Sequence, residues 1–212
     1  MGERFVPTPA GRARLDSFPA HGAPRATLLL GHGTATGVEA PDLQALARAL
    51  PAIGITVVLA TQPYRIEHDR GVADEQSLDT AWTAIWPVVS TPGVPMIAGG
   101  RSAGSQVACR TAGSLGARAV LALAYPLLGP GSPVELLATD APTLVIQGGS
   151  DPFGRPEQFP TLPPDIELVA IPGANHMFST SPSHADPDPL AQITDAVIEW
   201  LGRQLVPARV RA

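Results

Sequence analysis

The sequence contains no lysine, so all 14 of its basic residues are arginine. A Walker-type phosphate-binding loop needs a lysine after its glycine, and Schiff-base chemistry and a Ser-Lys catalytic pair both need a lysine amine. The missing lysine therefore excludes these three kinds of site. The net charge is −5 and the arginines are scattered, whereas a nucleic-acid-binding protein presents a clustered basic surface, so we expect no nucleic-acid partner.

Cysteine and long apolar segments are also scarce. Cys109 is the single cysteine, so no internal disulfide can form. The N-terminal segment MGERFVPTPAGRARLD has no apolar stretch of the kind that a signal peptide carries. No apolar run approaches the roughly 20 residues that a helix needs to cross a bilayer. These features predict a cytoplasmic protein that does not associate with membranes.

The length and the hydrophobic pattern predict one α/β domain. With 212 residues, 44% of them hydrophobic, the chain can bury one core and is too short for two full domains. Short β-branched and aliphatic runs alternate with longer segments of helical periodicity, a pattern typical of a mostly parallel sheet with helices on both faces. We predict a single domain over 1–212, with an N-terminal ribbon at about 1–25 and a loose tail at about 207–212. The predicted strands are 26–30, 55–60, 94–98, 119–124, 143–147 and 166–171, and the predicted helices are 41–50, 72–89, 102–112 and 190–205.

Residues 100–104, with the sequence GRSAG, match the pattern Gly-x-Ser-x-Gly. The serine of this pattern occupies a tight turn between a strand and a helix, in a strained conformation that requires small residues on both sides. A predicted strand precedes the motif and an amphipathic segment follows it, so the context fits. The N-terminus of the following helix also favours negative charge at Ser102. We interpret Ser102 as a nucleophile, and the alternative is a glycine-rich turn with an incidental serine.

Asp151 and His176 are the candidates for the acid and the base that such a serine needs. A histidine must take the proton of the hydroxyl, and a carboxylate must orient that histidine. When this motif lies between a strand and a helix of a parallel α/β sheet, the chain order is Ser, then Asp or Glu, then His. Asp151 and His176 each follow a predicted strand, which places both at the same edge of the sheet as Ser102. His184, in a polar loop, is the alternative base.

The connection between the predicted strands at 119–124 and 143–147 is short. Larger enzymes with this motif insert a lid there. Here the connection holds fewer than 20 residues and is interrupted by Pro126, Pro130 and Pro133, which break helices. A helical lid domain does not fit, so we expect an open site.

Residues 31–34, with the sequence GHGT, follow the first buried strand. In proteins with this nucleophile motif, one backbone N–H for the oxyanion comes from this loop and the other from the residue after the nucleophile. We predict that the N–H groups of Thr34 and Ala103 hold the oxyanion and that His32 holds the loop structurally. A Gly-x-Gly turn can also bind a dinucleotide, but the glycine spacing is not the standard one and no acidic residue ends the next strand.

Three further residues are candidates for substrate binding. Tyr64 and Arg65 follow the predicted strand at 55–60 and would line the substrate cleft, with Arg65 or Arg101 binding a substrate carboxylate. The alternative is a solvated loop arginine. Cys109 is interpreted as a packing residue. The histidines lie far apart in the sequence without the spacing of metal ligands, so we expect neither a metal nor a cofactor.

Five blocks of the sequence together resemble a known family over most of the chain. The blocks are GHGTATG, GGRSAGSQVA, AYPLLGPGSP, VIQGGSDPFG and IPGANHMF. They resemble a lidless α/β-hydrolase-like family that includes the testis-expressed proteins and a subunit of the non-specific lethal chromatin complex, and that is related to dienelactone hydrolases. The resemblance implies an α/β-hydrolase fold and a triad of Ser102, Asp151 and His176. Two departures are Ala103, where a bulkier residue is usual, and the serine nucleophile, where dienelactone hydrolases use cysteine.

These observations predict a serine hydrolase without a cofactor. It would cleave esters or thioesters of small or exposed acyl groups through an acyl-Ser102 intermediate, with a small-molecule substrate. The alternatives are a non-catalytic α/β-hydrolase scaffold that binds a partner protein, and a peptidase or haloperoxidase-like activity on the same triad.

Overall fold

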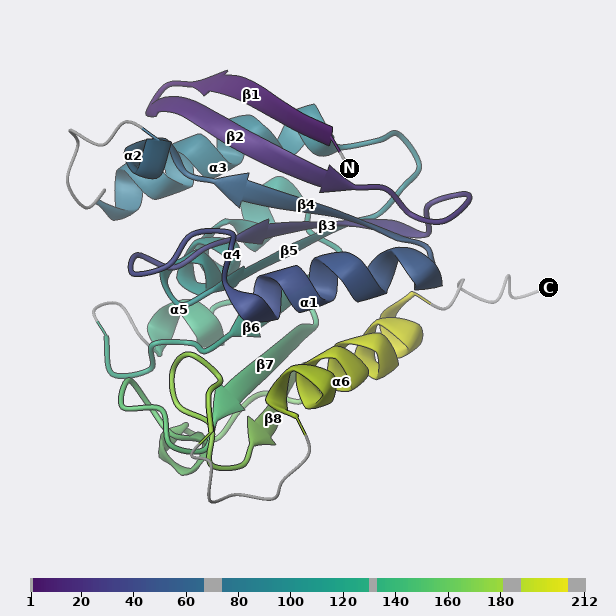
Figure 1. The fold of residues 1–212 in the computed structure, drawn as a ribbon. Helices are drawn as coiled ribbons and strands as arrows, with labels where there is room; N and C mark the ends of the chain where they lie inside the picture. The colour runs from purple at the N-terminus through teal and green to yellow at the C-terminus, as the bar shows by residue number, and fades with distance from the viewer. Residues whose placement is uncertain (1, 67–73, 130–132, 181–187, 206–212) are drawn as a thin grey trace.

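The protein folds around one central sheet, as shown by a computed structural model that describes residues 2–66, 74–129, 133–180 and 188–205 (Figure 1). The strands are β1 (Gly2–Thr8), β2 (Gly11–Phe18), β3 (Ala26–Gly31), β4 (Ile55–Thr61), β5 (Met96–Arg101), β6 (Ala119–Leu123), β7 (Thr143–Gly148) and β8 (Ile166–Ile171). They form an eight-stranded sheet in the order β1-β2-β4-β3-β5-β6-β7-β8. β1 and β2 pair antiparallel, β2 is antiparallel to β4, and every other pair is parallel.

The strand order reverses its direction at the carboxyl ends of β3 and β5. The chain passes from β3 to its neighbour β4 on one side and then to β5 on the other, so the direction of winding reverses there. Ligands of open α/β sheets bind in the crevice at such a reversal. Every residue of β3, β5, β6 and β7 is buried, including Arg101 in β5 and Gln147 in β7, as expected for strands covered on both faces.

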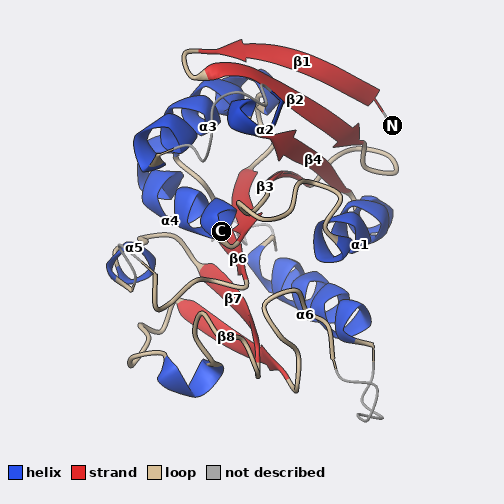
Figure 2. Cartoon of the chain, turned by 60° about the vertical axis from the view of Figure 1, so that its left-hand side comes forward, coloured by secondary structure: helices blue, strands red, loops and turns tan. Residues whose placement is uncertain are grey.

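Helices cover both faces of the sheet (Figures 1 and 2). α1 (Pro41–Ala49) and α6 (Pro189–Gln204) share one core, while α3 (Glu75–Val89) and α4 (Ala103–Leu115) share the other. In α3 the buried residues Leu78, Trp82 and Ile85 recur at helical spacing, and so form the stripe that packs on the sheet. The remaining helical turns are α2 (Pro63–Ile66), α5 (Val134–Leu137), and the 3-10 turns Leu50–Ile53 and Pro156–Gln158.

The predicted α/β-hydrolase fold, a mostly parallel sheet with helices on both faces, is confirmed. The predicted N-terminal ribbon is a full hairpin, because β1 pairs with β2 along its whole length, and the sequence analysis did not recognise β1. The first described residue of the predicted helix at 72–89 is Asp74, whose side chain caps α3 by accepting the Ser77 N–H. The predicted loose tail lies outside the described residues.

The connection between β6 and β7 holds no helical lid domain in its described part. It contributes only α5, a helix of four residues. Figure 1 shows this short helix beside the carboxyl ends of the strands. Among the described residues, no helix is both long enough and apolar enough to cross a membrane.

Candidate active site

Ser102 occupies a sharp turn between β5 and α4. Its φ of 52° lies in the left-handed region, and its N–H donates to the Leu123 carbonyl at 2.9 Å. The glycines around it are required by backbone contacts: a Cβ on Gly100 would lie 2.4 Å from the backbone of Gly104, and one on Gly104 would lie 2.7 Å from the carbonyl oxygen of Gly31. The turn therefore holds the serine just after the carboxyl end of β5, and larger residues on either side would displace it.

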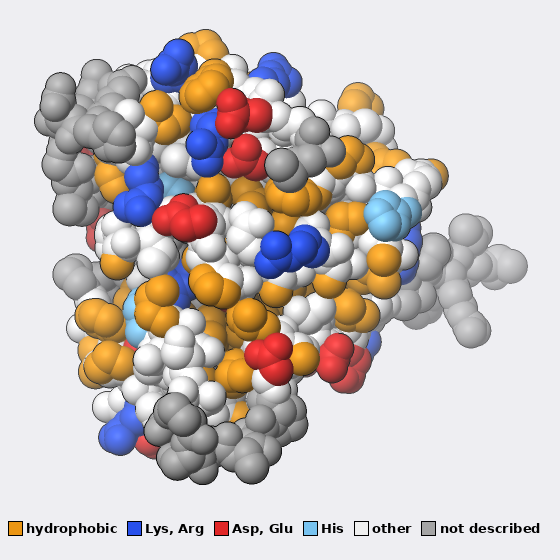
Figure 3. Space-filling model, in the orientation of Figure 1, with side chains coloured by type: hydrophobic (Ala, Val, Ile, Leu, Met, Phe, Trp, Pro, Cys, Tyr) orange, Lys and Arg blue, Asp and Glu red, His pale blue; other side chains and the backbone are white. Residues whose placement is uncertain are grey.

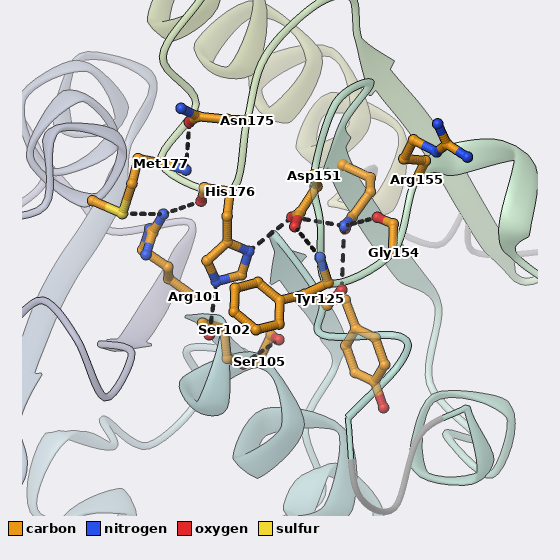
Figure 4. Close-up of polar contacts among 12 residues, drawn as sticks. Arg101, Ser102, Ser105, Tyr125, Asp151, Gly154, Arg155, Asn175, His176 and Met177 are labelled. Carbon is orange, nitrogen blue, oxygen red and sulfur yellow. Dashed lines mark hydrogen bonds and ion pairs between the residues drawn. The ribbon is translucent and has the colours of Figure 1, made fainter.

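The structure brings Ser102, His176 and Asp151 together from three separate loops (Figure 4). His176 Nε2 lies 3.0 Å from Ser102 Oγ, and His176 Nδ1 lies 2.8 Å from Asp151 Oδ2. Because an ionised carboxylate only accepts hydrogen bonds, Nδ1 carries the proton, and Nε2 has its lone pair free to accept from the serine hydroxyl. This is the arrangement in which a histidine can take the proton of a serine as the oxygen attacks.

Asp151 is fully buried and its oxygens are held by three donors. Oδ2 accepts from Gln147 Nε2 at 3.0 Å in addition to the imidazole, and Oδ1 accepts from the Phe153 N–H at 2.8 Å. Donors around a buried carboxylate stabilise its charged form and fix its orientation. Gln147 was not singled out by the sequence analysis, because its position inside β7 predicts only a strand residue.

The loop that carries His176 is shaped by Asn175. The Asn175 side-chain oxygen accepts from the N–H groups of Met177 at 2.8 Å and Ser179 at 3.1 Å, and the Asn175 N–H donates to the Ser179 carbonyl. Phe178 completes the turn with a φ of 53°. These local bonds give the loop a defined shape around the imidazole. His184, the alternative base, lies outside the described residues.

Of the two predicted oxyanion donors, Ala103 follows Ser102 directly, and Thr34 follows Gly33, which lies close to Ser102. A Cβ on Gly33 would lie 3.0 Å from the Ser102 Cβ, so the loop before Thr34 approaches the serine closely. Within the described ranges, neither the Thr34 N–H nor the Ala103 N–H has a protein acceptor. Ala103 opens α4, and the first N–H groups of a helix have no partner inside it. Both groups are therefore available to an anionic oxygen, and that role stays a prediction.

His32 links the loops after β3 and β4. Its Nδ1 bonds the Gly33 carbonyl at 2.8 Å, and its Nε2 accepts the Gln62 N–H at 3.0 Å, which makes Nδ1 the protonated nitrogen. Burial lowers the pKa of His32. A neutral, fully bonded imidazole is what a structural histidine requires, and this matches the role expected from the sequence.

Tyr64 and Arg65 contact the loop that precedes α1. The Tyr64 hydroxyl donates to the Gly33 carbonyl at 3.3 Å, and Arg65 reaches the Thr34 carbonyl at 3.5 Å and Glu39 Oε1 at 3.4 Å. Burial raises the pKa of Tyr64, so its hydroxyl stays a neutral donor. In this structure both side chains support the loop that holds Thr34, one of the two candidate oxyanion donors, and contact with a substrate stays a prediction.

Arg101 does not have the position expected of a substrate-binding residue. Its side chain is 1% exposed and forms an ion pair with Asp42, which is equally buried. A guanidinium enclosed in this way has no surface to offer a substrate carboxylate. The sequence analysis proposed Arg101 as a residue that binds a substrate carboxylate, but in the structure its guanidinium pairs with Asp42 inside the protein.

Phe153 is a residue of the site that the sequence analysis missed. Its ring is 50% exposed, and the ring centroid lies 4.6 Å from that of His176. Its N–H donates to Asp151, as described above, and its carbonyl accepts the Leu128 N–H at 2.9 Å. The backbone is therefore fixed on both sides, and the ring forms an apolar surface next to the imidazole. The motif Asp-Pro-Phe-Gly was the available signal.

Within the described chain, neither the thiol of Cys109 nor a cluster of metal ligands takes part in this arrangement. Cys109 is buried in α4, and burial raises the pKa of its thiol to about 12, so it is a packing residue. In the part of the chain that the structure describes, no three His, Cys, Asp or Glu side chains gather as metal ligands would.

Comparison with known proteins agrees with the fold. A family model described as "Alpha/beta hydrolase domain" matches residues 24–201. The chain belongs to this α/β-hydrolase family. The match covers β3 to α6 and so includes every candidate site residue. No curated protein sequence matches the chain.

Solved α/β-hydrolase structures resemble the chain over almost its whole length. A lidless α/β serine hydrolase from Xanthomonas campestris has a TM-score of 0.80 at 22% identity, covering 98% of this chain and 95% of that one. A dienelactone hydrolase from Anabaena variabilis has a TM-score of 0.73 at 23% identity, with 95% and 97% covered. An esterase from Thermogutta terrifontis has a TM-score of 0.69 at 18% identity, with 97% and 100% covered. At these identities the likeness establishes the shared fold, and the narrower resemblance to the testis-expressed and chromatin-complex proteins stays a prediction.

Proposed function

We propose that the protein is a serine hydrolase that cleaves carboxylic esters or thioesters through an acyl-Ser102 intermediate. The observation that carries the proposal is the continuous hydrogen-bonded chain from Asp151 through His176 to Ser102, with distances of 2.8 and 3.0 Å. Family membership and the esterases among the structural relatives support the same reaction class. A cytoplasmic location stays a prediction of the sequence.

The reaction follows from the positions of the three side chains. Ser102 Oγ attacks the acyl carbon while His176 Nε2 takes its proton, and Asp151 stabilises the imidazolium that forms. The N–H groups of Thr34 and Ala103 hold the negative oxygen of the tetrahedral intermediate, and each such donor contributes about 3 kcal/mol. His176 then gives the proton to the leaving oxygen or sulfur. Water repeats the cycle on the acyl-enzyme and releases the acid.

The surroundings of the site favour a small-molecule substrate with a small or exposed acyl group. The described part of the connection between β6 and β7 contributes only α5, so no lid domain there would enclose a long chain. The half-exposed ring of Phe153 offers an apolar contact next to the base. A peptidase or haloperoxidase-like activity on the same triad is the second candidate within this chemistry, and a non-catalytic scaffold is the candidate outside it.

The proposal is tested by labelling the protein with a fluorophosphonate, which bonds to an activated serine. We expect one adduct on Ser102 by mass spectrometry and hydrolysis of short p-nitrophenyl esters and of an acetyl thioester. Ser102→Ala and His176→Ala should lose both labelling and turnover while remaining folded by circular dichroism. A folded native chain that neither labels nor turns over any substrate would remove the hydrolase proposal and favour the scaffold.

A further inference from the structure

Arg101 precedes the candidate nucleophile, yet its guanidinium connects three other segments inside the protein. Nε donates to Asp42 Oδ2 at 3.0 Å, at the start of α1. Nη1 donates to Thr36 Oγ1 at 3.4 Å, in the loop after β3. Nη2 donates to the backbone carbonyl of His176 and contacts Met177 Sδ at 3.5 Å (Figure 4). The loop that carries the candidate base is thereby attached to the residue next to the nucleophile.

We propose that Arg101 is a positioning residue, which fixes the His176 peptide and through it the distance between His176 Nε2 and Ser102 Oγ. This inference rests on the proposed function, because it assigns Arg101 a task in the same reaction. Arg101 touches neither the substrate nor the reacting atoms. It acts through the backbone of His176.

Apart from the bond to Ser102, the other hydrogen bonds in the described part of the His176 loop stay within the loop or lead to the loop of Asp151. The Ser150 N–H donates to the Ala174 carbonyl at 2.8 Å, which attaches the loop to that of Asp151 but not to β5. The bonds made by Asn175 lie within the loop and define its internal shape. Asp151 holds the imidazole ring at Nδ1 and lies on a different loop. Arg101 adds a link to β5, which ends at Arg101 itself, one peptide bond from Ser102. Besides the direct hydrogen bond between His176 Nε2 and Ser102 Oγ, the guanidinium therefore links the backbone of the base to the strand that ends beside the nucleophile.

An arginine suits this position and a lysine does not. A guanidinium is a rigid planar fork whose N–H groups point in several fixed directions, so one side chain can bond Asp42, Thr36 and the His176 carbonyl at once. A lysine ammonium is a single point charge on a flexible stem. A lysine could pair with Asp42, but it could not also bond Thr36 and the His176 carbonyl in the same geometry.

The buried ion pair with Asp42 makes a purely stabilising role a poor explanation. Replacing a buried ion pair with apolar residues of similar volume often leaves stability unchanged or raises it. Here the pair is also incompletely satisfied, since Asp42 Oδ1 has no hydrogen-bond partner within the described residues. Burial raises the pKa of Asp42, and the Arg101 charge opposes that rise. Asp42 therefore serves to neutralise the charge of Arg101, which must be buried at this place to reach the His176 carbonyl.

The test removes the positioning contact without leaving a buried charge. The double variant Arg101→Met/Asp42→Leu should remain folded, with kcat for a p-nitrophenyl ester lowered by about 100-fold, because a small misplacement of a catalytic group costs that much. KM should stay unchanged. Arg101→Lys, which keeps the charge beside Asp42, should be folded and intermediate in kcat. The matched control is Arg110→Met/Asp79→Leu/Glu135→Gln, which removes an arginine of α4 together with the charges of both carboxylates that pair with it at 2.8 Å, and it should keep kcat.

A second measurement needs no turnover. Nitrogen chemical shifts of the His176 imidazole report which nitrogen carries the proton: the native protein should show protonated Nδ1, and the double variant a mixture of the two forms. If the native protein hydrolyses esters and the folded variants keep both its kcat and its imidazole shifts, positioning by Arg101 is wrong while the hydrolase proposal stands. If the native protein hydrolyses nothing, the hydrolase proposal fails, and the imidazole shifts alone decide whether Arg101 positions His176.

Discussion

Replacing Ser102 with glycine should give a more stable protein than replacing it with alanine. Ser102 has φ 52° and ψ −121°, which costs a residue with a Cβ about 1–3 kcal/mol and costs glycine almost nothing. Both substitutions remove the hydrogen bond to His176, so their difference isolates the backbone. Glycine loses about 0.5–1 kcal/mol more conformational entropy on folding than alanine. The balance is about 1 kcal/mol in favour of glycine.

This difference can be measured by thermal unfolding followed by circular dichroism. For a chain of this size, 1 kcal/mol corresponds to about 2–4 °C in Tm, so Ser102→Gly should unfold about that far above Ser102→Ala. Ala196→Gly, inside α6, is the matched control and should lower Tm, because glycine in a helix costs about 1 kcal/mol relative to alanine. If Ser102→Gly unfolds at or below the Tm of Ser102→Ala, the serine is not strained and the reasoning is wrong.

Three further predictions follow from the same structure. Gly104→Ala should lower the free energy of unfolding, measured by urea titration, by about 1–3 kcal/mol, because the new Cβ would lie 2.7 Å from a backbone carbonyl oxygen. Gly202→Ala, in open space on α6, should raise the free energy of unfolding by about 1 kcal/mol. Burial lowers the pKa of His32 below 6.5, so below that pH the unfolded chain binds a proton that the folded chain does not. The free energy of unfolding should therefore fall as the pH drops from 7.5 to 5.5, and it should fall less in His32→Gln. Phe153→Ala should lower kcat/KM for esters with large apolar acyl groups by about 2–10-fold and spare acetate esters, because the exposed ring beside the imidazole loses an apolar contact with the larger substrates.

Each of these three predictions can be contradicted by a specific result. Equal unfolding free energies for the two glycine variants would show that the backbone gives way around Gly104. A loss of stability between pH 7.5 and 5.5 that is as large in His32→Gln as in the native protein would assign the effect to another group. The same loss of kcat/KM on all esters would mean that Phe153 supports the His176 ring and does not select the substrate.

The sequence predicted the position of the site because short-range signals mark where strands end. Gly-x-Ser-x-Gly after an apolar run, Asp151 after a second run and His176 after a third all fall at the carboxyl edge of a parallel sheet, whatever the strand order. The strand β1, which pairs with β2 in the N-terminal hairpin, was not predicted in this way. Its alternation of polar and apolar residues is weak, and its place was decided by pairing with β2.

The orientation of side chains was less accessible to the sequence. Arg101 adjoins Ser102 in the chain, yet its side chain turns to the other face of β5 and meets Asp42, a residue 59 positions away. Nothing near either residue in the sequence signals that pairing. The role of Phe153 could not be predicted for a similar reason. A phenylalanine in a turn is interpreted as a packing residue until the structure shows that its ring lies against His176.

By itself the sequence determined the fold class, the strand–turn–helix geometry around Ser102 and the set of candidate catalytic residues. These depend on local backbone preferences and on the order of strands and helices, which are written directly in the chain. Only the tertiary structure decided which candidates meet, that Arg101 holds the His176 loop instead of facing the substrate, and that Phe153 lies against the imidazole. Those outcomes depend on contacts between residues far apart in the sequence, and such contacts exist only once the sheet has assembled and the loops have packed against one another.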